Sequence, residues 1–452
     1  MPPMPHPPLD RRTLLAGSAA AALAPAAARA APLPAHGIDA ARYGVRSGAT
    51  DDQSVRLQRA IDEAARVRTP LVLAPGVYRT GALRLPAGAQ LIGVRGATKL
   101  VFTRGNALLA ADGGDSITLS GLTFDGARVA LPKNRGLVHL VQAKAVRIVD
   151  CTVSNANGNG IVIEGCDGVV ENNTIDTTAD TALFSTDGRG VTVRGNTIRG
   201  AGNGGIRVWQ SAKHHDGSVV TGNTIEDIAS QGGGTGENGN GVNVFRASGV
   251  IVSNNIIRRC AFSAVRGNAV SAMQVVGNQC GAIAEVALYA EFGFEGAVIS
   301  GNTVDGAALG VVTTNFNEGG RLATVQGNVI RNLKPTRPQG GPDAAGVGIA
   351  VEADAAVTGN VIEDAPVAGI SVGAGKYQRD VSVSGNVVRR AGRGIDVSVA
   401  SGAGHVAVTG NMIAEARHGA IVGMEWDKVA SDDLVRDAAR YPQLSISGNQ
   451  VR

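Results

Sequence analysis

One four-residue phrase, Gly-Asn-x-Ile/Val, recurs from residue 172 to the end of this 452-residue chain. Its full copies begin at Gly195, Gly222, Gly301, Gly327, Gly359, Gly385, Gly410 and Gly448, and looser copies begin at Asn172, Asn254 and Gly277. Successive asparagines most often fall 23 to 27 residues apart. A period in this range is typical of solenoids, in which each turn packs only against its neighbours. The repeat therefore predicts one stack of turns rather than several globular domains.

A second pattern, Gly-Ile/Val-x-Val, alternates with the first and predicts strands. It begins at Gly160, Gly205, Gly241, Gly348, Gly369 and Gly394. Alternating apolar residues are typical of a strand with one buried face. The 63 glycines suit tight turns, and an aromatic content of 3% suits a narrow interior. We therefore predict an all-β fold, a single-stranded right-handed parallel β-helix of about ten to twelve turns.

The asparagines of the repeated phrase occupy the same place in successive turns. This placement predicts a stacked ladder at a turn, where asparagine tolerates left-handed backbone angles and hydrogen-bonds its neighbours. We expect these side chains to be structural rather than ligands or catalysts. The predicted column contains Asn196, Asn223, Asn302, Asn328 and Asn360.

The N-terminus carries the features of an export signal. Asp10-Arg11-Arg12-Thr13-Leu14-Leu15 resembles the twin-arginine motif, and an uncharged, alanine-rich run follows from Thr13 to Ala28. This run is short for a membrane span, which takes about 20 residues. Ala28-Arg29-Ala30 offers a small-x-small cleavage site. We expect residues 1–30 to be removed, the twin-arginine translocase to be the export partner, and the mature chain to be periplasmic or secreted with no membrane segment.

The charges and cysteines limit the classes of partner. The formal net charge of +4 falls to +2 without residues 1–30, which argues against nucleic acid as a partner. The cysteine spacings match no zinc pattern, and we expect neither a metal nor another cofactor. Export permits disulfides, but buried free thiols are the favoured state. The cysteines are Cys151, Cys166, Cys260 and Cys280.

Residues 31–114 carry a different pattern, which begins with a predicted helix. Its apolar face comprises Val55, Leu57, Ile61, Ala64 and Ala65, and Thr50 or Asp51 supplies the N-cap. The order Tyr43-Gly44-Val45, Thr50-Asp51-Asp52, Leu57-Gln58-x-Ala60-Ile61 and Pro75-Gly76-x-Tyr78 resembles the N-terminal cap of pectate-lyase-like proteins. The resemblance implies a helix that plugs the open end of a right-handed parallel β-helix, which would otherwise expose apolar core and strand edge.

The rest of the chain, residues 115–452, is predicted to form the repeats. The rhythm breaks at residues 425–441, where an amphipathic helical insertion is predicted from Trp426, Val429, Leu434, Ala438 and Tyr441. The twin-arginine motif together with the repeats also resembles a family of twin-arginine-exported repeat proteins within the pectate-lyase-like superfamily. That resemblance covers nearly the whole chain and implies architecture and export, but the family has no assigned activity.

The outward positions of the Gly-Ile-x-Val strands predict a binding site. If Ile206 and Val208 point inward, Arg207 and Trp209 point outward. Aligned turn by turn, the middle turns present one patch of Arg207, Trp209, Asn243, Phe245, Arg266, Asn268, Tyr289 and Glu291. Exposed aromatic rings on a strand face are unusual unless they contact something, and rings beside arginines suit a polysaccharide groove. The alternative is that loops from neighbouring turns cover the patch.

Roles can be assigned for a lyase or epimerase acting on an acidic polysaccharide. Such an enzyme needs a cation to neutralise the uronate, a base and an acid. Arg266, with Arg207, would neutralise, Glu291 or His214 would be the base, and Tyr289 the acid. The predicted substrate-binding residues are Arg207, Trp209, Asn243, Phe245 and Asn268. A hydrolase would instead need two carboxylates, for which Glu291 and Glu295 are the nearest pair.

Two known activities cannot be transferred to this chain by its motifs. The Gly-His-Gly of polygalacturonases does not occur, and Arg207-Val208-Trp209-Gln210 stands where mannuronan epimerases carry Asp-Pro-His-Asp/Glu. Two functions therefore remain open: an exported enzyme that acts on a polysaccharide, and a non-catalytic glycan-binding or envelope protein. A tailspike-like adhesin fits less well. We expect a monomer whose partner is a glycan.

Overall fold

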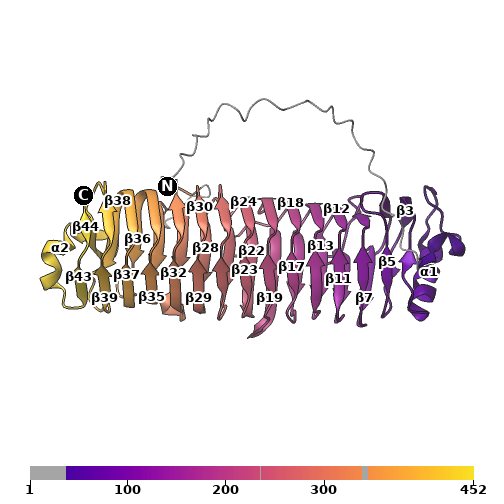
Figure 1. Ribbon diagram of the computed structural model, residues 1–452, viewed down its shortest axis with the longest axis horizontal. Coiled ribbons are helices and arrows are strands. Elements are labelled where there is room, and N and C mark those ends of the chain that lie inside the picture. The colour runs from indigo at the N-terminus through magenta and orange to yellow at the C-terminus, as the bar shows by residue number, and fades with distance from the viewer. Residues whose placement is uncertain (1–36, 235, 338–344) are drawn as a thin grey trace, which may run out of the picture. The chain divides into compact units, whose positions relative to one another are not determined.

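The computed structural model describes residues 37–234, 236–337 and 345–452; the predicted signal peptide, residues 1–30, lies outside them. These residues form a parallel β-helix in which each regular turn contributes three strands, one to each of three faces (Figure 1). The first face is a 16-stranded sheet, and the second and third faces together form a 28-stranded sheet. The stack is longer than the ten to twelve turns that we predicted from the repeat, because the N-terminal turns lack the asparagine phrase.

The strands of each face pair in parallel, turn upon turn. The first face contains β1 (Ile38–Asp39), β2 (Leu71–Val72), β5 (Gln90–Ile92), β8 (Thr118–Ser120), β11 (Val146–Val149), β14 (Gly168–Glu171), β17 (Thr192–Arg194), β20 (Val219–Thr221), β23 (Ile251–Ser253), β26 (Gln274–Val276), β29 (Glu295–Ser300), β32 (Arg321–Gln326), β35 (Ala353–Thr358), β37 (Arg379–Ser384), β39 (Val406–Thr409) and β43 (Leu444–Ser447). The second face contains β3 (Gly76–Thr80), β6 (Thr98–Phe102), β9 (Thr123–Asp125), β12 (Thr152–Ala156), β15 (Thr174–Thr178), β18 (Thr197–Ala201), β21 (Thr224–Ile228), β24 (Ile256–Cys260), β27 (Gln279–Gly281), β30 (Thr303–Asp305), β33 (Val329–Arg331), β40 (Met412–Ala414) and β44 (Gln450–Val451).

The third face carries the Gly-Ile-x-Val pattern. It contains β4 (Leu83–Arg84), β7 (Leu109–Asp112), β10 (Gly136–Val141), β13 (Asn159–Glu164), β16 (Thr181–Thr186), β19 (Gly204–His215), β22 (Asn240–Ser248), β25 (Val265–Asn268), β28 (Val286–Glu291), β31 (Leu309–Thr313), β34 (Val347–Val351) and β41 (Ile421–Glu425). Two longer strands, β36 (Val361–Val372) and β38 (Val387–Ser398), continue across both the second and third faces.

The predicted asparagine ladder is confirmed at the turn between the first and second faces. The amide Nδ2 of Asn302 donates to Oδ1 of Asn328 at 2.9 Å and to the carbonyl oxygen of Val275 at 2.9 Å, and its backbone N–H donates to the same Oδ1. Equivalent bonds join Asn173, Asn196, Asn223, Asn255, Asn278, Asn302, Asn328, Asn360, Asn386, Asn411 and Asn449. The ladder thus satisfies polar groups that lie inside the fold.

The two residues of the Gly-Asn phrase have different roles in this turn. The prediction gave the left-handed backbone angle to the ladder asparagine, and this detail is corrected. The left-handed backbone position belongs to the residue before the ladder asparagine, with φ of +64° at Gly301 and +55° at Asn254. Glycine suits that position because it carries no Cβ. One turn before Asn173, the ladder position is taken by buried Cys151, whose N–H donates to Oδ1 of Asn173.

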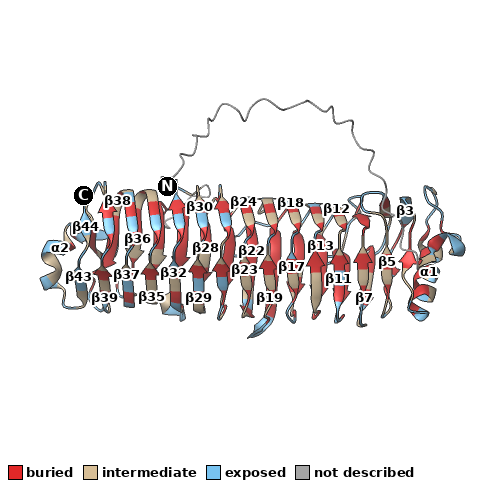
Figure 2. Cartoon of the chain, in the orientation of Figure 1, coloured by how far each residue is buried: buried red, intermediate tan, exposed pale blue. Residues whose placement is uncertain are grey.

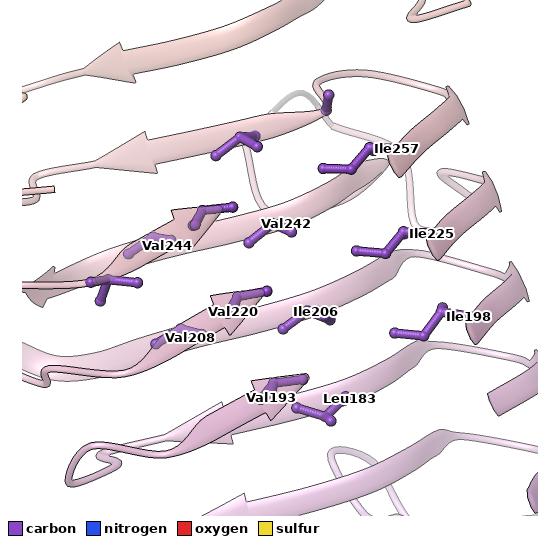
Figure 3. Close-up of a cluster of buried hydrophobic side chains, with 14 of the residues drawn as sticks. Leu183, Val193, Ile198, Ile206, Val208, Val220, Ile225, Val242, Val244 and Ile257 are labelled. Carbon is purple, nitrogen blue, oxygen red and sulfur yellow. The ribbon is translucent and has the colours of Figure 1, made fainter. Parts of the chain in front are cut away.

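The core fills the inside of the stack with small aliphatic side chains from all three faces. Figure 3 shows Val193 and Val220 from the first face, Ile198 from the second, and Leu183 and Ile206 from the third, all pointing into one interior. Figure 2 shows the same distribution along the strands, where buried positions alternate with partly exposed ones. This packing gives the continuous apolar interior that parallel turns require.

Helix α1 (Ser54–Arg66) caps the N-terminal end, as predicted, and packs on the core through Leu57, Ala60, Ile61 and Ala64. Val55 is 84% exposed and therefore does not belong to the buried face that we assigned to it. The helix also begins later than expected. Gln53 precedes its first turn, and Asp52 rather than Thr50 or Asp51 accepts a hydrogen bond from the backbone N–H of Ser54 at 2.7 Å.

The C-terminal insertion combines a hairpin with a short helical stretch, so the helical insertion predicted over residues 425–441 is present only in its second half. Strand β42 (Lys428–Ser431) pairs antiparallel with β41, and only the short helices α2 (Leu434–Asp437) and η3 (Ala438–Arg440) follow. Trp426 lies at the hairpin turn with a positive φ and is 54% exposed. Leu434 alone of the five predicted apolar positions is fully buried, because the chain reverses direction before it.

All four cysteines are buried and free, as the sequence favoured. Burial raises the pKa of the Cys151 and Cys280 thiols to about 12, so both remain protonated at neutral pH. They act as small apolar core residues.

Candidate functional site

The outward columns of the third face follow the predicted alignment. Arg207 lies opposite Asn243, and Arg266 opposite Tyr289, in the first column. In the second column, Trp209 lies opposite Phe245 and Asn268 opposite Glu291. Ile206 and Val208 are fully buried, so the residues between and after them face outward. The predicted patch is therefore continuous in register, although its two halves have different surroundings.

The first half of the patch is an aromatic cluster rather than an open groove. The ring of Trp209 makes edge contacts with Phe184 and Phe245, at centroid distances of 5.1 Å and 5.6 Å. The Arg207 guanidinium lies over the Trp209 ring at 5.2 Å. The indole N–H of Trp209 donates to Oδ1 of Asn243 at 2.7 Å. These four predicted binding residues, Arg207, Trp209, Asn243 and Phe245, thus pack against one another.

A glycine-rich loop, residues 229–239, contacts Arg207 and Asn243 of this cluster through its described residues. Nη2 of Arg207 donates to Oδ1 of Asn238 at 2.7 Å, and Nδ2 of Asn243 donates to the carbonyl oxygen of Gly236 at 3.0 Å. Arg207 is only 6% exposed, and burial lowers the pKa of its guanidinium. The alternative of a loop cover therefore describes Arg207 and Asn243, whereas the rings of Phe184, Trp209 and Phe245 stay partly exposed.

The second half of the patch contains a buried ion pair. Nε and Nη2 of Arg266 donate to the two carboxylate oxygens of Glu291 at 2.6 Å and 2.7 Å. Nδ2 of Asn268 donates to Oε1 of Glu291 at 2.9 Å. Glu291 is 1% exposed, and the Arg266 guanidinium lies 5.1 Å from the centre of the Tyr289 ring. The carboxylate is fully engaged, so it could act as a base only after this pair separates.

A second carboxylate extends the ion pair into a network that the sequence did not reveal. Glu285, which precedes β28, accepts from Nη1 of Arg266 at 3.4 Å and from Nη1 of Arg337 at 3.3 Å. Ser263 Oγ donates to the same carboxylate at 3.4 Å. Charges alternate from Glu291 through Arg266 and Glu285 to Arg337, so the network holds these side chains in fixed positions.

This network forms one wall of a cleft of about 820 Å³ on the third face, which we call the central cleft. Four predicted residues line it: Arg266, Asn268, Tyr289 and Glu291. Its floor is apolar and consists of Val286, Leu309, Val312, Val347 and Ala350. Glu352 and Ser371 lie farther along, so the cleft reaches past the turns that the sequence marked.

Two groups in the central cleft keep their protons to unusually high pH. Burial raises the pKa of the Tyr289 phenol to about 12, and the negative charge of Glu291 adds to the effect. Burial also raises the pKa of Glu352, although the backbone N–H of Phe316, 2.6 Å from the carboxylate, partly offsets it. Burial therefore favours the protonated form of Tyr289 and shifts Glu352 in the same direction, and nothing in the sequence indicated the shift at Glu352.

His214 and Glu295 do not join this site. The β19 strand bulges after Trp209, and His214 lies exposed near its end with Nδ1 2.7 Å from the carbonyl oxygen of His215. Glu295 lies on the first face in β29, where it binds Nη1 of Arg321 at 2.7 Å. The Glu291–Glu295 pair that we considered for a hydrolase is therefore not assembled, and His214 lines a different hollow beside Asp216.

The covering loops had one signal in the sequence. Asn223 and Asn255 are 32 residues apart, as are Asn328 and Asn360, against the usual 23 to 27. The first of these long periods contains the loop that binds Arg207, and the second contains Arg337. Long periods in a solenoid mark loops on one face.

Within the residue ranges 37–234, 236–337 and 345–452, no group of three or more histidine, cysteine, aspartate or glutamate side chains is placed to hold a metal ion. None of the helices in those ranges has the length and apolar character needed to cross a membrane.

The fold and the site place this chain among parallel β-helix proteins that carry a cleft on one outward face. The sequence of residues 92–225 and 213–413 matches the family described as right handed beta helix region, and the chain belongs to that family. The match confirms the predicted fold class and its handedness. No curated protein matches the chain by sequence.

Solved structures of several functions share the fold. The catalytic unit of the GH87 α-1,3-glucanase from Streptomyces thermodiastaticus is 16% identical, with 94% of this chain and 70% of that one covered, at a TM-score of 0.50. The surface adhesin PfbA of Streptococcus pneumoniae is 15% identical, with 87% of this chain and 94% of that one covered, at a TM-score of 0.49. The A-module of the Azotobacter vinelandii mannuronan C-5 epimerase AlgE6 is 13% identical, with 92% of this chain and 99% of that one covered, at a TM-score of 0.42. At these identities the likeness shows the fold alone, so function has to be argued from the site.

Proposed function

We propose that the chain binds a polysaccharide in the central cleft. The observation that carries the proposal is the combination of an apolar floor with hydrogen-bonding groups at its edge. Tyr289 offers a ring face and a protonated hydroxyl, and Asn268, Glu352 and Ser371 line the same cleft. Sugars present apolar C–H faces and hydroxyl edges, which this arrangement complements. The glucanase and the epimerase among the similar structures are glycan-active by description, which makes a glycan ligand reasonable for this fold.

The charges of the central cleft favour a neutral glycan over the acidic one expected from the sequence. Arg266 is paired with Glu291 and Glu285, and Arg337 is paired with Glu285. Neither arginine is therefore available to a uronate unless a buried ion pair breaks, which is costly. An acidic ligand for this cleft remains a prediction from the sequence, and the binding experiment below includes it.

Binding is better supported here than catalysis. The predicted base, Glu291, is held by three hydrogen-bond donors. Glu352 has the raised pKa of a general acid and lies two turns from Glu291 in the same outward column, about 9.6 Å between Cα atoms at the usual strand spacing. Inverting glycosidases use two carboxyl groups far enough apart to hold a water between them, so two glutamates two turns apart in one cleft make hydrolysis the second candidate function. It requires Glu291 to leave Arg266.

Calorimetric titration with matched neutral and acidic oligosaccharides tests the binding proposal. We expect a neutral oligosaccharide to bind the wild type and to lose most of its affinity in Tyr289→Ala. Trp426→Ala, which removes an exposed aromatic ring outside the cleft, should bind like the wild type. A wild type that binds no glycan of either class would overturn the proposal. Release of reducing ends, lost in Glu352→Gln, would establish the hydrolase.

Export through the twin-arginine pathway is a further part of the proposed function. It rests on Arg11-Arg12 and on the uncharged run that follows. Replacing both arginines by lysine should leave the chain in the cytoplasm, because the translocase recognises the pair. Cell fractionation of the wild type and the double variant measures this, and equal export of the two would contradict it.

A further inference from the structure

A second cleft lies on the third face near the N-terminal end, and its chemistry differs from that of the central cleft. Its volume is about 860 Å³, and His139 of β10 lies in it. His139 occupies the first outward column, between Ala110 and Val162, and is 4% exposed. It lies six turns before Tyr289, or about 29 Å at the usual strand spacing. The aromatic cluster separates the two clefts.

The backbone fixes how the imidazole of His139 presents itself. The backbone N–H of Gly136 donates to Nδ1 of His139 at 3.3 Å. A ring nitrogen that accepts a hydrogen bond carries no proton, so the neutral ring carries its proton on Nε2. Burial, aided by the charge of Arg135, lowers the pKa of this imidazole to about 4. No acceptor for Nε2 exists among the residues that the structure describes.

The charged side chains around this second cleft are all without ion-pair partners in the described part of the chain. Three cations line it, Arg84, Lys133 and Arg135, and two carboxylates, Asp112 and Glu164. The arginines of the central cleft, by contrast, are neutralised by glutamates. Unpaired charges at a cleft remain available to a ligand, and the balance of the five is one positive charge.

We infer that the cleft around His139 is a second binding site and that its ligand is a sugar acid, free or at the end of a glycan. Lys133 and Arg135 pair with its carboxylate, and Nε2–H of His139 donates to a neighbouring oxygen. Asp112 and Glu164 accept hydrogen bonds from its hydroxyls. A doubly charged phosphate fits this set poorly, since it would face the two carboxylates without hydroxyls to offer them. A ligand with one negative charge and several hydroxyl groups satisfies Lys133, Arg135, His139, Asp112 and Glu164, and it balances the net positive charge to which Arg84 contributes.

Titration of the full mature chain with glucuronate-containing disaccharide, its neutral glucose counterpart and inorganic phosphate tests this inference. We expect the uronate disaccharide to bind and the other two to bind more weakly. The double variant Lys133→Gln, Arg135→Gln should weaken uronate binding by about tenfold or more, the effect of losing a charge-assisted contact. Both side chains are exposed, so the variant keeps its core. Lys428→Gln, which removes an exposed cation far along the chain, is the matched control and should change nothing.

A spectroscopic signal locates the ligand independently of affinity. In ¹⁵N-histidine-labelled protein, the Nε2–H resonance of His139 should shift on addition of the uronate, and His139→Gln should remove that resonance. Unchanged affinity in the double variant, no shift at His139, or phosphate binding as tight as the uronate would each overturn the inference. Binding of the neutral glycan in the central cleft is measured separately, so the failure of one site is distinguishable from the failure of the other.

Discussion

The asparagine turn and the third face use the same turn-by-turn register in opposite ways. At the turn, Asn302 hydrogen-bonds its own counterparts one turn away on each side, Asn278 and Asn328. On the third face, Arg266 pairs with Glu291 of the next turn and with Glu285, which precedes the same strand. Its guanidinium also lies over the ring of Tyr289. The first arrangement repeats, whereas the second occurs in one place. The repeated asparagine bonds stabilise the stack. The side chains that differ from turn to turn on the third face are the ones that can recognise a ligand.

The difference also sets where a substitution should cost most. A ladder asparagine that is lost leaves neutral groups unpaired. A lost member of the ion network leaves a buried charge with fewer partners, which is more costly in a low-dielectric site.

Glu291→Gln should lower the free energy of unfolding by about 3 kcal/mol, the lower end of the cost of breaking a buried ion pair, because Arg266 keeps Glu285 as a partner. Denaturant titration followed by circular dichroism measures it. Glu415→Gln, which breaks an exposed pair with Arg389, is the matched control and should change stability far less. A similar loss in both variants would mean that burial does not distinguish this network.

Acid should destabilise the chain through His139. Its pKa is about 4 in the folded protein, against about 6.5 in an unfolded chain, so the stabilising contribution is present above pH 6.5 and is lost as the pH falls to 4. The expected loss is roughly 2–3 kcal/mol. The unfolding free energy of wild type and His139→Gln, measured across that range, should converge toward low pH. Parallel curves would show that His139 titrates normally.

Asn302→Leu should lower the free energy of unfolding by about 1–3 kcal/mol, because the backbone N–H of Asn278 loses its Oδ1 acceptor and the carbonyl oxygen of Val275 loses a donor. The same denaturant titration applies. Asn449, the last member of the ladder, has a neighbour on one side only, so Asn449→Leu should cost less. Equal costs at the two positions would contradict a ladder whose strength comes from neighbours on both sides.

The features that repeat from turn to turn could be predicted from the sequence, whereas those that occur once could not. The ladder and the outward columns could be predicted. The ladder neighbours of Asn302 and the strand neighbours of Arg207 each lie one repeat away in the sequence. The cover over Arg207 could not, since Gly236 and Asn238 belong to a loop with no counterpart in other turns. Glu352 and His139 were missed for another reason. Their importance comes from burial and from a backbone donor, and neither property is visible in the residue type.

The distinction between a covered and an open patch can be measured directly at Trp209. Trp209→Phe removes the N–H donor to Oδ1 of Asn243 and should cost about 1 kcal/mol of stability. Trp426→Phe, at the exposed hairpin turn, should cost little, and it leaves Trp209 as the sole tryptophan of the chain. In that variant we expect a blue-shifted emission that iodide quenches weakly, because the ring packs between Phe184 and Phe245 and under the Arg207 guanidinium. Strong quenching would mean that the loop leaves the rings accessible, and the aromatic cluster would then belong to the binding surface after all.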